Sequence, residues 1–130
     1  MHDTKNFKVS EFACKCCGKN IISQKVIDMA QKIRDYIGVP VRVNSGYRCD
    51  KHNAAVGGVK NSKHTKGLAA DLSCGNTPQE KAEGARKLFE AVKDLKAKGE
   101  LPDLDYCIRY KTFIHIDCGG KRNNRWEIRA

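Results

Sequence analysis

Two histidines and one aspartate have the residue types and the spacing to bind a metal ion together. His64 and Asp71 are seven positions apart, and Gly67 allows a tight backbone path between them. Such a pair is common by chance, but His115 adds a third candidate downstream, in a run at 113–118 that predicts a buried strand. Two imidazoles and one carboxylate are a ligand set typical of catalytic zinc, which keeps a fourth position free for water.

The residues upstream of His64 extend this motif. The chain reads Ser45-Gly46-Tyr47-Arg48 and continues with Asn53, Val56-Gly57-Gly58 and Ser62. Together these residues give the pattern SGYR…N…VGG…S-x-H-x-x-G-x-A-x-D, with a later H-x-D. The pattern closely resembles that of the zinc D-Ala-D-Ala carboxypeptidase family, the M15 type of metallopeptidase. This family includes phage and bacterial enzymes that cut cell-wall stem peptides, and the resemblance covers most of the chain.

The resemblance implies a zinc-dependent peptidase that hydrolyses peptidoglycan stem peptides, as a D-Ala-D-Ala carboxypeptidase or as an endolysin-type endopeptidase. It implies that His64, Asp71 and His115 bind the zinc ion. Arg48 and Ser62 match family positions that contact the carbonyl or carboxylate of the substrate. The alternative is a catalytically inactive zinc-binding module of the same fold. Arg48 and Ser62 favour the enzyme, because a purely structural metal needs neither of them.

The general base is the least defined part of this site. Several branches of the resembled family carry an acidic residue three positions before the last histidine ligand, where this chain has Thr112. Asp117 is the first candidate for the base, since residues two apart on a strand share a face and would place it beside His115. The competing role, orientation of His115 through a hydrogen bond, is slightly favoured. Tyr110 is a weaker candidate, as a donor to the tetrahedral intermediate.

The length and the charge of the chain limit its domain organisation and its partners. A chain of 130 residues fits a single zinc peptidase domain, with 1–22 as an extended cysteine-rich lead-in and 23–130 as the catalytic core. The formal net charge of +10 suits an anionic cell envelope as partner. Because the basic residues are scattered without interleaved aromatic residues, we expect no nucleic-acid binding. We expect a monomer.

The sequence contains no apolar run as long as a membrane span, and its polar start lacks the apolar core of a signal peptide. We therefore expect a protein that is made in the cytoplasm without a signal peptide. It would act on the cell wall after release by phage lysis or an equivalent route.

Seven cysteines are a high and odd number for this length. Cys14, Cys16 and Cys17 cluster near the start, and the other four are dispersed. Without a signal peptide a disulfide framework is not the default, so reduced and mostly buried thiols are expected. The alternative is a disulfide or a structural metal near Cys14. A metal would need a distant partner such as Cys49, because no second C-x-x-C pair follows.

Periodicity and capping signals predict an α+β fold, in which a small antiparallel sheet carries helices on one side. The resembled family has this fold, of the Hedgehog/DD-peptidase type. Helices are predicted from the Ser23 cap to Gly38 and from the Thr77 cap to about residue 98. A helical turn with a solvated His52 is expected at 50–55. The predicted strands are 41–44, 104–110, 113–118 and 125–129, the segment 62–71 is a loop followed by a strand, and a further loop lies at 119–124.

Overall fold

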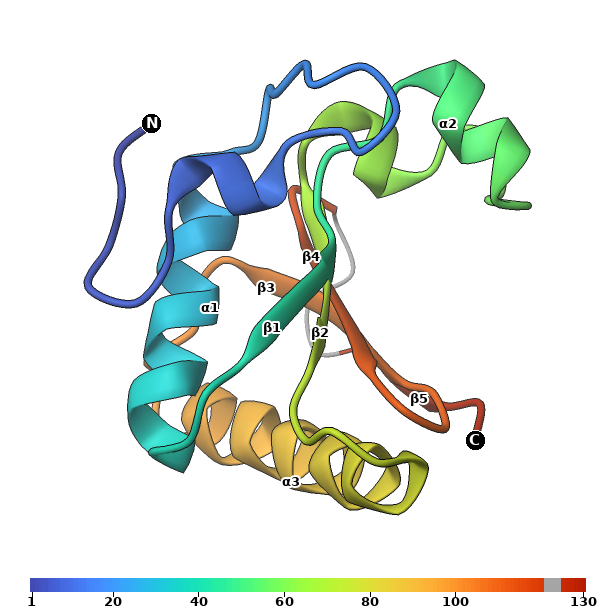
Figure 1. Cartoon of the computed structure of the whole chain (residues 1–130). Coiled ribbons are helices and arrows are strands. Elements are labelled where there is room, and N and C mark those ends of the chain that lie inside the picture. Colours follow the sequence, from blue (N-terminus) through green and yellow to red (C-terminus); the bar gives the residue numbers. More distant parts are fainter. Residues whose placement is uncertain (121–124) are drawn as a thin grey trace.

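The computed structural model describes residues 1–120 and 125–130 (Figure 1). Its centre is a five-stranded sheet with the strand order β1-β2-β4-β3-β5. The strands are β1 (Arg42–Ser45), β2 (Ala69–Ser73), β3 (Leu104–Arg109), β4 (Ile114–Cys118) and β5 (Arg125–Ile128). The predicted α+β class is confirmed, and so is the predicted hairpin, because β3 and β4 pair antiparallel across a short connection.

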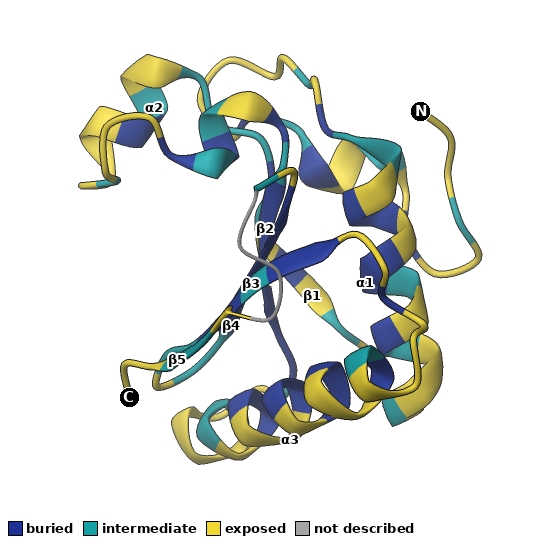
Figure 2. Cartoon of the chain, turned by 180° about the vertical axis from the view of Figure 1, so that it is seen from behind, coloured by how far each residue is buried: buried dark blue, intermediate teal, exposed yellow. Residues whose placement is uncertain are grey.

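Two long helices, α1 (Gln24–Ile37) and α3 (Pro78–Ala97), pack against each other and against the sheet. Figure 2 shows that the sides of these helices that face the sheet are buried, whereas their outer sides are exposed. Both helix starts match the sequence. The Ser23 hydroxyl accepts a hydrogen bond from the backbone N–H of Lys25, and Thr77 forms a capping box with Glu80.

Three short helical elements lie outside this pair. The helix α2 (Asp50–Ala55) lies at the end of the molecule opposite to α3 (Figure 1). The 3₁₀ helix η2 (Lys63–Lys66) occupies the part of segment 62–71 that was predicted as a loop. The third, η1 (Val9–Phe12), interrupts the lead-in at 1–22 that was predicted as extended. The backbone N–H of Lys8 donates to the Glu11 carboxylate at 2.7 Å, and this local bond closes the turn that alternation of apolar residues did not reveal.

The strand register separates a core face of the sheet from a polar face. On β4, Ile114 and Ile116 belong to the hydrophobic core, and His115 and Asp117 point to the other face. On β2, Ala70 and Leu72 belong to the core, so Asp71 between them points to the polar face. Asp71 pairs with His115 in the register of the two strands. The helices therefore cover one face, and the opposite face is left to carry polar side chains.

The sheet is mixed, which corrects the prediction of a purely antiparallel one. The last strand, β5, pairs with β3 in parallel orientation. The cause is the strand order. β4 has β2 on one side and β3 on the other, and β5 pairs at the outer edge of β3. Because β5 runs opposite to β4, which is antiparallel to β3, it runs in the same direction as β3. Residues 121–124 of the predicted loop 119–124 lie outside the described residues.

The N-terminal lead-in contributes to the same core as the rest of the chain. Phe7, Phe12 and Ile22 are buried in one cluster with residues of α1, α3 and the sheet. Gly46 lies directly against Phe12, and a Cβ atom on this glycine would come within 2.5 Å of the Phe12 carbonyl oxygen. The lead-in and the end of β1 are therefore in close backbone contact.

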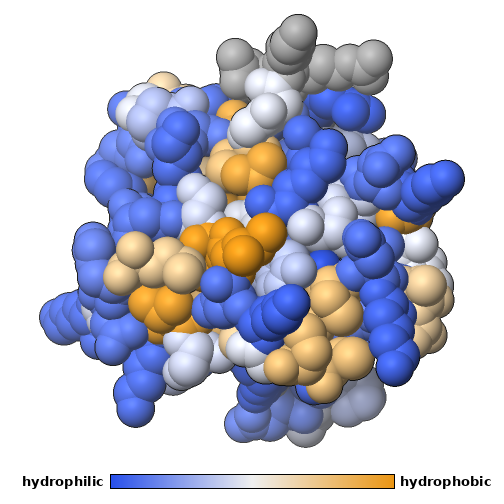
Figure 3. Space-filling model, turned by 90° about the horizontal axis from the view of Figure 1, so that it is seen from above, coloured by the Kyte–Doolittle hydropathy of each residue, from blue (hydrophilic) through white to orange (hydrophobic). Residues whose placement is uncertain are grey.

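The surface above the lead-in and α2 is mainly hydrophilic, with small and separate hydrophobic patches (Figure 3). Among the described residues, no helix has both the length and the apolar character that crossing a bilayer requires.

Candidate active site

Three elements bring His64, Asp71 and His115 to one point on the polar face of the sheet. η2 carries His64, β2 carries Asp71, and β4 carries His115 opposite Asp71. Gly67 links η2 to β2 with a left-handed backbone (φ 70°), and a Cβ there would come within 2.2 Å of the Ile21 carbonyl oxygen. The predicted need for glycine in this tight connection thus has a specific cause in the packing.

The three side chains present their donor atoms to one another at metal-site distances. Asp71 Oδ1 lies 3.2 Å from His64 Nε2 and 3.1 Å from His115 Nδ1, and all three atoms are within 4.8 Å of each other. Tetrahedral zinc with bonds of about 2.0–2.2 Å to nitrogen and oxygen requires donor–donor separations of about 3.3 Å. The donor set and its spacing therefore fit zinc.

The outer nitrogen of each imidazole is held by a different acceptor. His64 Nδ1 lies 2.8 Å from the Gly46 carbonyl oxygen, which can only accept, so this nitrogen donates. His115 Nε2 lies 2.8 Å from Asp117 Oδ2 and donates to that carboxylate. These bonds leave the inner nitrogens, His64 Nε2 and His115 Nδ1, directed at Asp71.

The close approach of the two inner nitrogens to the Asp71 carboxylate requires a proton or a cation between them. Two imidazole lone pairs and a carboxylate oxygen at 3.1–3.2 Å repel one another unless a proton or a cation lies between them. The His115 pKa reflects this: burial lowers it, but hydrogen bonds to Asp117 and Asp71 and the charges of these groups raise it to about 9. The Asp71 pKa is raised by burial, yet the bonds and charges of His115 and His64 hold it well below its usual range. A metal ion would satisfy all three acceptors at once.

Arg48 contacts the other oxygen of the central carboxylate. Its Nη2 lies 3.1 Å from Asp71 Oδ2, its Nε donates to Ser45 Oγ at 2.9 Å, and its Nη1 donates to Asn53 Oδ1 at 3.2 Å. Asn53 is itself fixed, because its amide donates to the Val59 carbonyl oxygen at 2.9 Å. The guanidinium is thus held beside the Asp71 carboxylate by contacts with three neighbours. Ser45 and Asn53 stand in the sequence motif, but their role as supports of Arg48 was not predicted.

Ser62 is buried and is the N-cap residue of η2. Its hydroxyl accepts a hydrogen bond from the His64 backbone N–H at 3.2 Å, and this bond fixes the first turn that carries the histidine. The hydroxyl hydrogen is not used in this contact.

The candidates for the base differ in their surroundings. Asp117 is 3% exposed, and its carboxylate faces His115, with the Oδ1 atom buried and without a partner in the described structure. Thr112 lies in the β3–β4 connection. The Tyr110 hydroxyl accepts from Arg129 Nη1 at 3.2 Å, and its ring stacks on Phe113.

Tyr106 was missed by sequence reasoning. Its ring packs edge-on against His115, with centroids 6.4 Å apart, and its hydroxyl bonds to Glu127. No motif contains this tyrosine, because the contact depends on the pairing of β3 with β4. His52, predicted to be solvated, does not belong to the ligand group.

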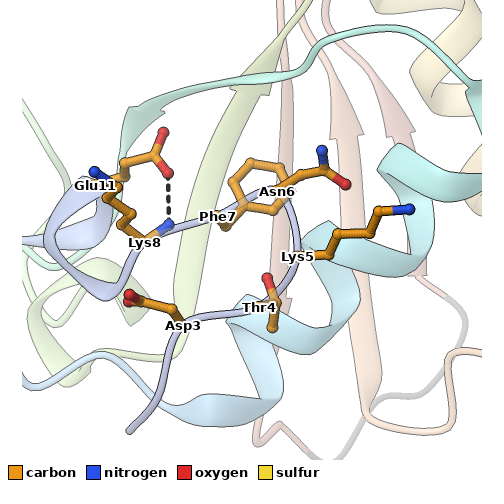
Figure 4. Close-up of a pocket in the computed structure, with 7 residues that line it drawn as sticks. All are labelled: Asp3, Thr4, Lys5, Asn6, Phe7, Lys8 and Glu11. Atoms are coloured by element: carbon orange, nitrogen blue, oxygen red, sulfur yellow. Dashed lines mark hydrogen bonds between the residues drawn. The ribbon is translucent and has the colours of Figure 1, made fainter.

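A separate surface pocket lies in the N-terminal segment and shares no residue with this site (Figure 4). Its lining comes from one continuous turn of the chain: Asp3, Thr4, Lys5, Asn6, Phe7, Lys8 and Glu11. It holds no histidine or cysteine that could join the metal ligands.

The family comparison agrees with this geometry. The family model described as Peptidase M15 matches residues 5–117, which include most of the lead-in and every residue of the site through Asp117. No curated protein matches the chain. Peptidases of this family typically depend on zinc, in agreement with the donor set, and the match does not favour an inactive module. The chain therefore belongs to the peptidase M15 family.

Proposed function

We propose that this protein is a zinc-dependent peptidase that hydrolyses peptidoglycan stem peptides, as a D-Ala-D-Ala carboxypeptidase or an endolysin-type endopeptidase. The observation that carries the proposal is the convergence of His64 Nε2, Asp71 Oδ1 and His115 Nδ1 within 4.8 Å, with Arg48 at the edge of the cluster. The family match supports the peptidase class. The net charge of +10 supports an anionic cell envelope as the setting.

His64, Asp71 and His115 would hold the zinc ion. Zinc in such a site activates a water molecule and polarises the scissile carbonyl. The protein's own contribution is to keep both imidazoles in the tautomer that turns a lone pair inward. The Gly46 carbonyl and the Asp117 carboxylate do this by accepting the outer N–H groups.

Arg48 is proposed to bind the substrate carboxylate or the developing oxyanion. Its planar guanidinium suits either group, and the contacts with Ser45 and Asn53 hold it in place before the substrate arrives. Ser62 is proposed as a second substrate contact, since its hydroxyl hydrogen is free to donate while its oxygen caps η2.

Asp117 is proposed to orient His115, and the 2.8 Å contact with Nε2 supports this role over that of general base. A carboxylate already engaged with the ring and 3% exposed has little access to a proton of the substrate or water. Both roles make distinct predictions.

The function is tested by digesting purified peptidoglycan with the zinc-loaded protein and identifying the fragments by mass. Released D-alanine indicates a carboxypeptidase, and opened cross-links indicate an endopeptidase. His64→Ala and His115→Ala should each lose about one zinc ion per chain and the activity, because two remaining donors hold zinc poorly. His52→Ala is the matched control and should keep both. Full zinc content in the two site variants would refute the ligand assignment, and a fully loaded but inactive protein would refute the peptidase.

Zinc binding should weaken as the pH falls. The His115 pKa is raised to about 9, so below this pH zinc must displace a proton from the ring. The apparent zinc affinity should fall by up to about tenfold per pH unit. Chelator competition at pH values between about 6.5 and 9 measures it. His52→Ala should show the same slope. A zinc affinity that did not change with pH in this window would show that zinc displaces no proton from the His115 ring.

Arg48→Ala should lower peptide hydrolysis by roughly 10²–10³-fold, as expected for loss of an oxyanion or carboxylate contact. Saturating zinc in the assay separates this effect from any change in metal affinity caused by the lost Asp71 contact. Arg86→Ala is the control, since Arg86 is exposed on α3 and forms an ion pair with Glu83 away from the ligand cluster. Turnover equal to that of the control would make Arg48 a structural residue only.

Asp117→Asn separates the two roles of this residue. As an orienting residue, its change should weaken zinc affinity by about 10–100-fold, and excess zinc should restore part of the activity. As a general base, its change should leave zinc bound and abolish turnover. Asp105→Asn is the matched control, because Asp105 is also buried and its Oδ1 has no partner among the described residues, but it lies outside the ligand cluster. Normal affinity and normal turnover in Asp117→Asn would exclude both roles.

A further inference from the structure

A second group of potential metal ligands lies apart from the histidine site. The sulfur atoms of Cys14, Cys17 and Cys49 are all within 4.8 Å of one another, although Cys49 is far from the other two in the sequence. Tetrahedral zinc with Zn–S bonds of about 2.3 Å places its sulfur ligands about 3.8 Å apart. The three thiols are therefore close to the spacing that one zinc ion imposes.

The backbone around Cys14 forms a turn that is closed by two hydrogen bonds. The Cys14 N–H donates to the Lys19 carbonyl oxygen at 2.8 Å, and the Gly18 N–H donates to the Cys14 carbonyl oxygen at 2.9 Å. Gly18 has a left-handed backbone with φ 76°. This residue lets the chain reverse directly after Cys17, so that the C-x-x-C pair at 14–17 can bind one ion from two sides.

Backbone N–H groups are directed at the sulfur atoms. The Cys49 N–H donates to Cys14 Sγ at 3.4 Å, and the His52 N–H donates to Cys49 Sγ at 3.4 Å. Hydrogen bonds of this kind favour the ionised thiolate, which is the form that binds metals.

Cys16 is the fourth thiol of this region. It lies between Cys14 and Cys17 in the sequence and is exposed, and it is not one of the three thiols that lie within 4.8 Å of one another. The remaining cysteines, Cys74, Cys107 and Cys118, are buried and join no such group among the described residues.

We propose that Cys14, Cys17 and Cys49 bind a structural zinc ion. Soft thiolate ligands select zinc among the common divalent ions. This second zinc is independent of the histidine site and of the peptidase proposal.

The position of the proposed ion gives it a role in the architecture. Cys49 follows Arg48 directly, and the backbone N–H of Tyr47 donates to the Phe12 carbonyl oxygen at 2.8 Å. Gly46, one residue earlier, accepts the bond from His64. A zinc ion on these cysteines would fasten the lead-in to the segment 46–49, which holds Arg48 and the carbonyl that orients His64.

The test uses the full chain carrying His64→Ala and His115→Ala, so that the histidine site is disabled. Prepared with reductant and zinc, this variant should still contain about one zinc ion per chain, and the parent about two. Adding Cys17→Ala or Cys49→Ala should remove the remaining zinc. Adding Cys74→Ala, the matched control, should leave the zinc content unchanged.

Cobalt substitution gives a readout independent of activity. Co²⁺ in the same background should show sulfur-to-metal charge-transfer absorption in the near ultraviolet, and Cys49→Ala should abolish it. If the double variant does not fold, the same measurement can be made on the parent chain. The histidine site contributes no sulfur ligand, so the charge-transfer band reports on the cysteine site alone. Zinc content unaffected by Cys17→Ala and Cys49→Ala would overturn the proposal. The proposal would also be overturned if mass analysis found these thiols joined as disulfides and the protein bound no zinc after the disulfides were reduced.

Discussion

The buried carboxylate of Asp71 is the interaction on which the rest of the site depends. Its Oδ1 faces both imidazoles and its Oδ2 faces the Arg48 guanidinium, while its side chain is only 10% exposed. A charge removed from water in this way is costly unless every oxygen is matched by a positive or hydrogen-bonding partner. The neighbouring elements supply those partners: η2 brings His64, β4 brings His115, and the end of β1 leads to Arg48. A metal ion at the centre would complete the match, because the inner nitrogens and Oδ1 are all acceptors.

Much of this arrangement could be predicted from the sequence, because local patterns encode it. The capping residues Ser23 and Thr77 define where the two long helices begin. The alternation around His115 assigns Ile114 and Ile116 to the core and turns the histidine to the opposite face. Long-range pairing is not encoded in this way. The alternating residues of β5 indicate a strand, but its parallel partner depends on which sheet edge is still free after β2, β3 and β4 have paired.

Side-chain contacts were less predictable than strand faces. Strand periodicity places Asp117 on the side of His115, yet orientation and proton transfer are both compatible with a shared face. The 2.8 Å contact that favours orientation depends on how the imidazole ring turns, and sequence spacing carries no such information. Tyr106 shows the same limit. It reaches the His115 ring from β3 next to an irregularity in the β3–β4 register, which no periodic pattern anticipates.

The lead-in and the active site are connected through a few residues at the end of β1. Gly46 has no room for a side chain against the Phe12 backbone, and its carbonyl holds His64 on the other side. Any displacement of the lead-in would therefore move the acceptor that sets the tautomer of a metal ligand. Phe12 resists such displacement through burial in the core, but Cys16 and Cys17 lie on the surface, where hydrophobic packing contributes little. A thiolate-bound ion between this turn and Cys49 would supply rigidity at the point where the core supplies none.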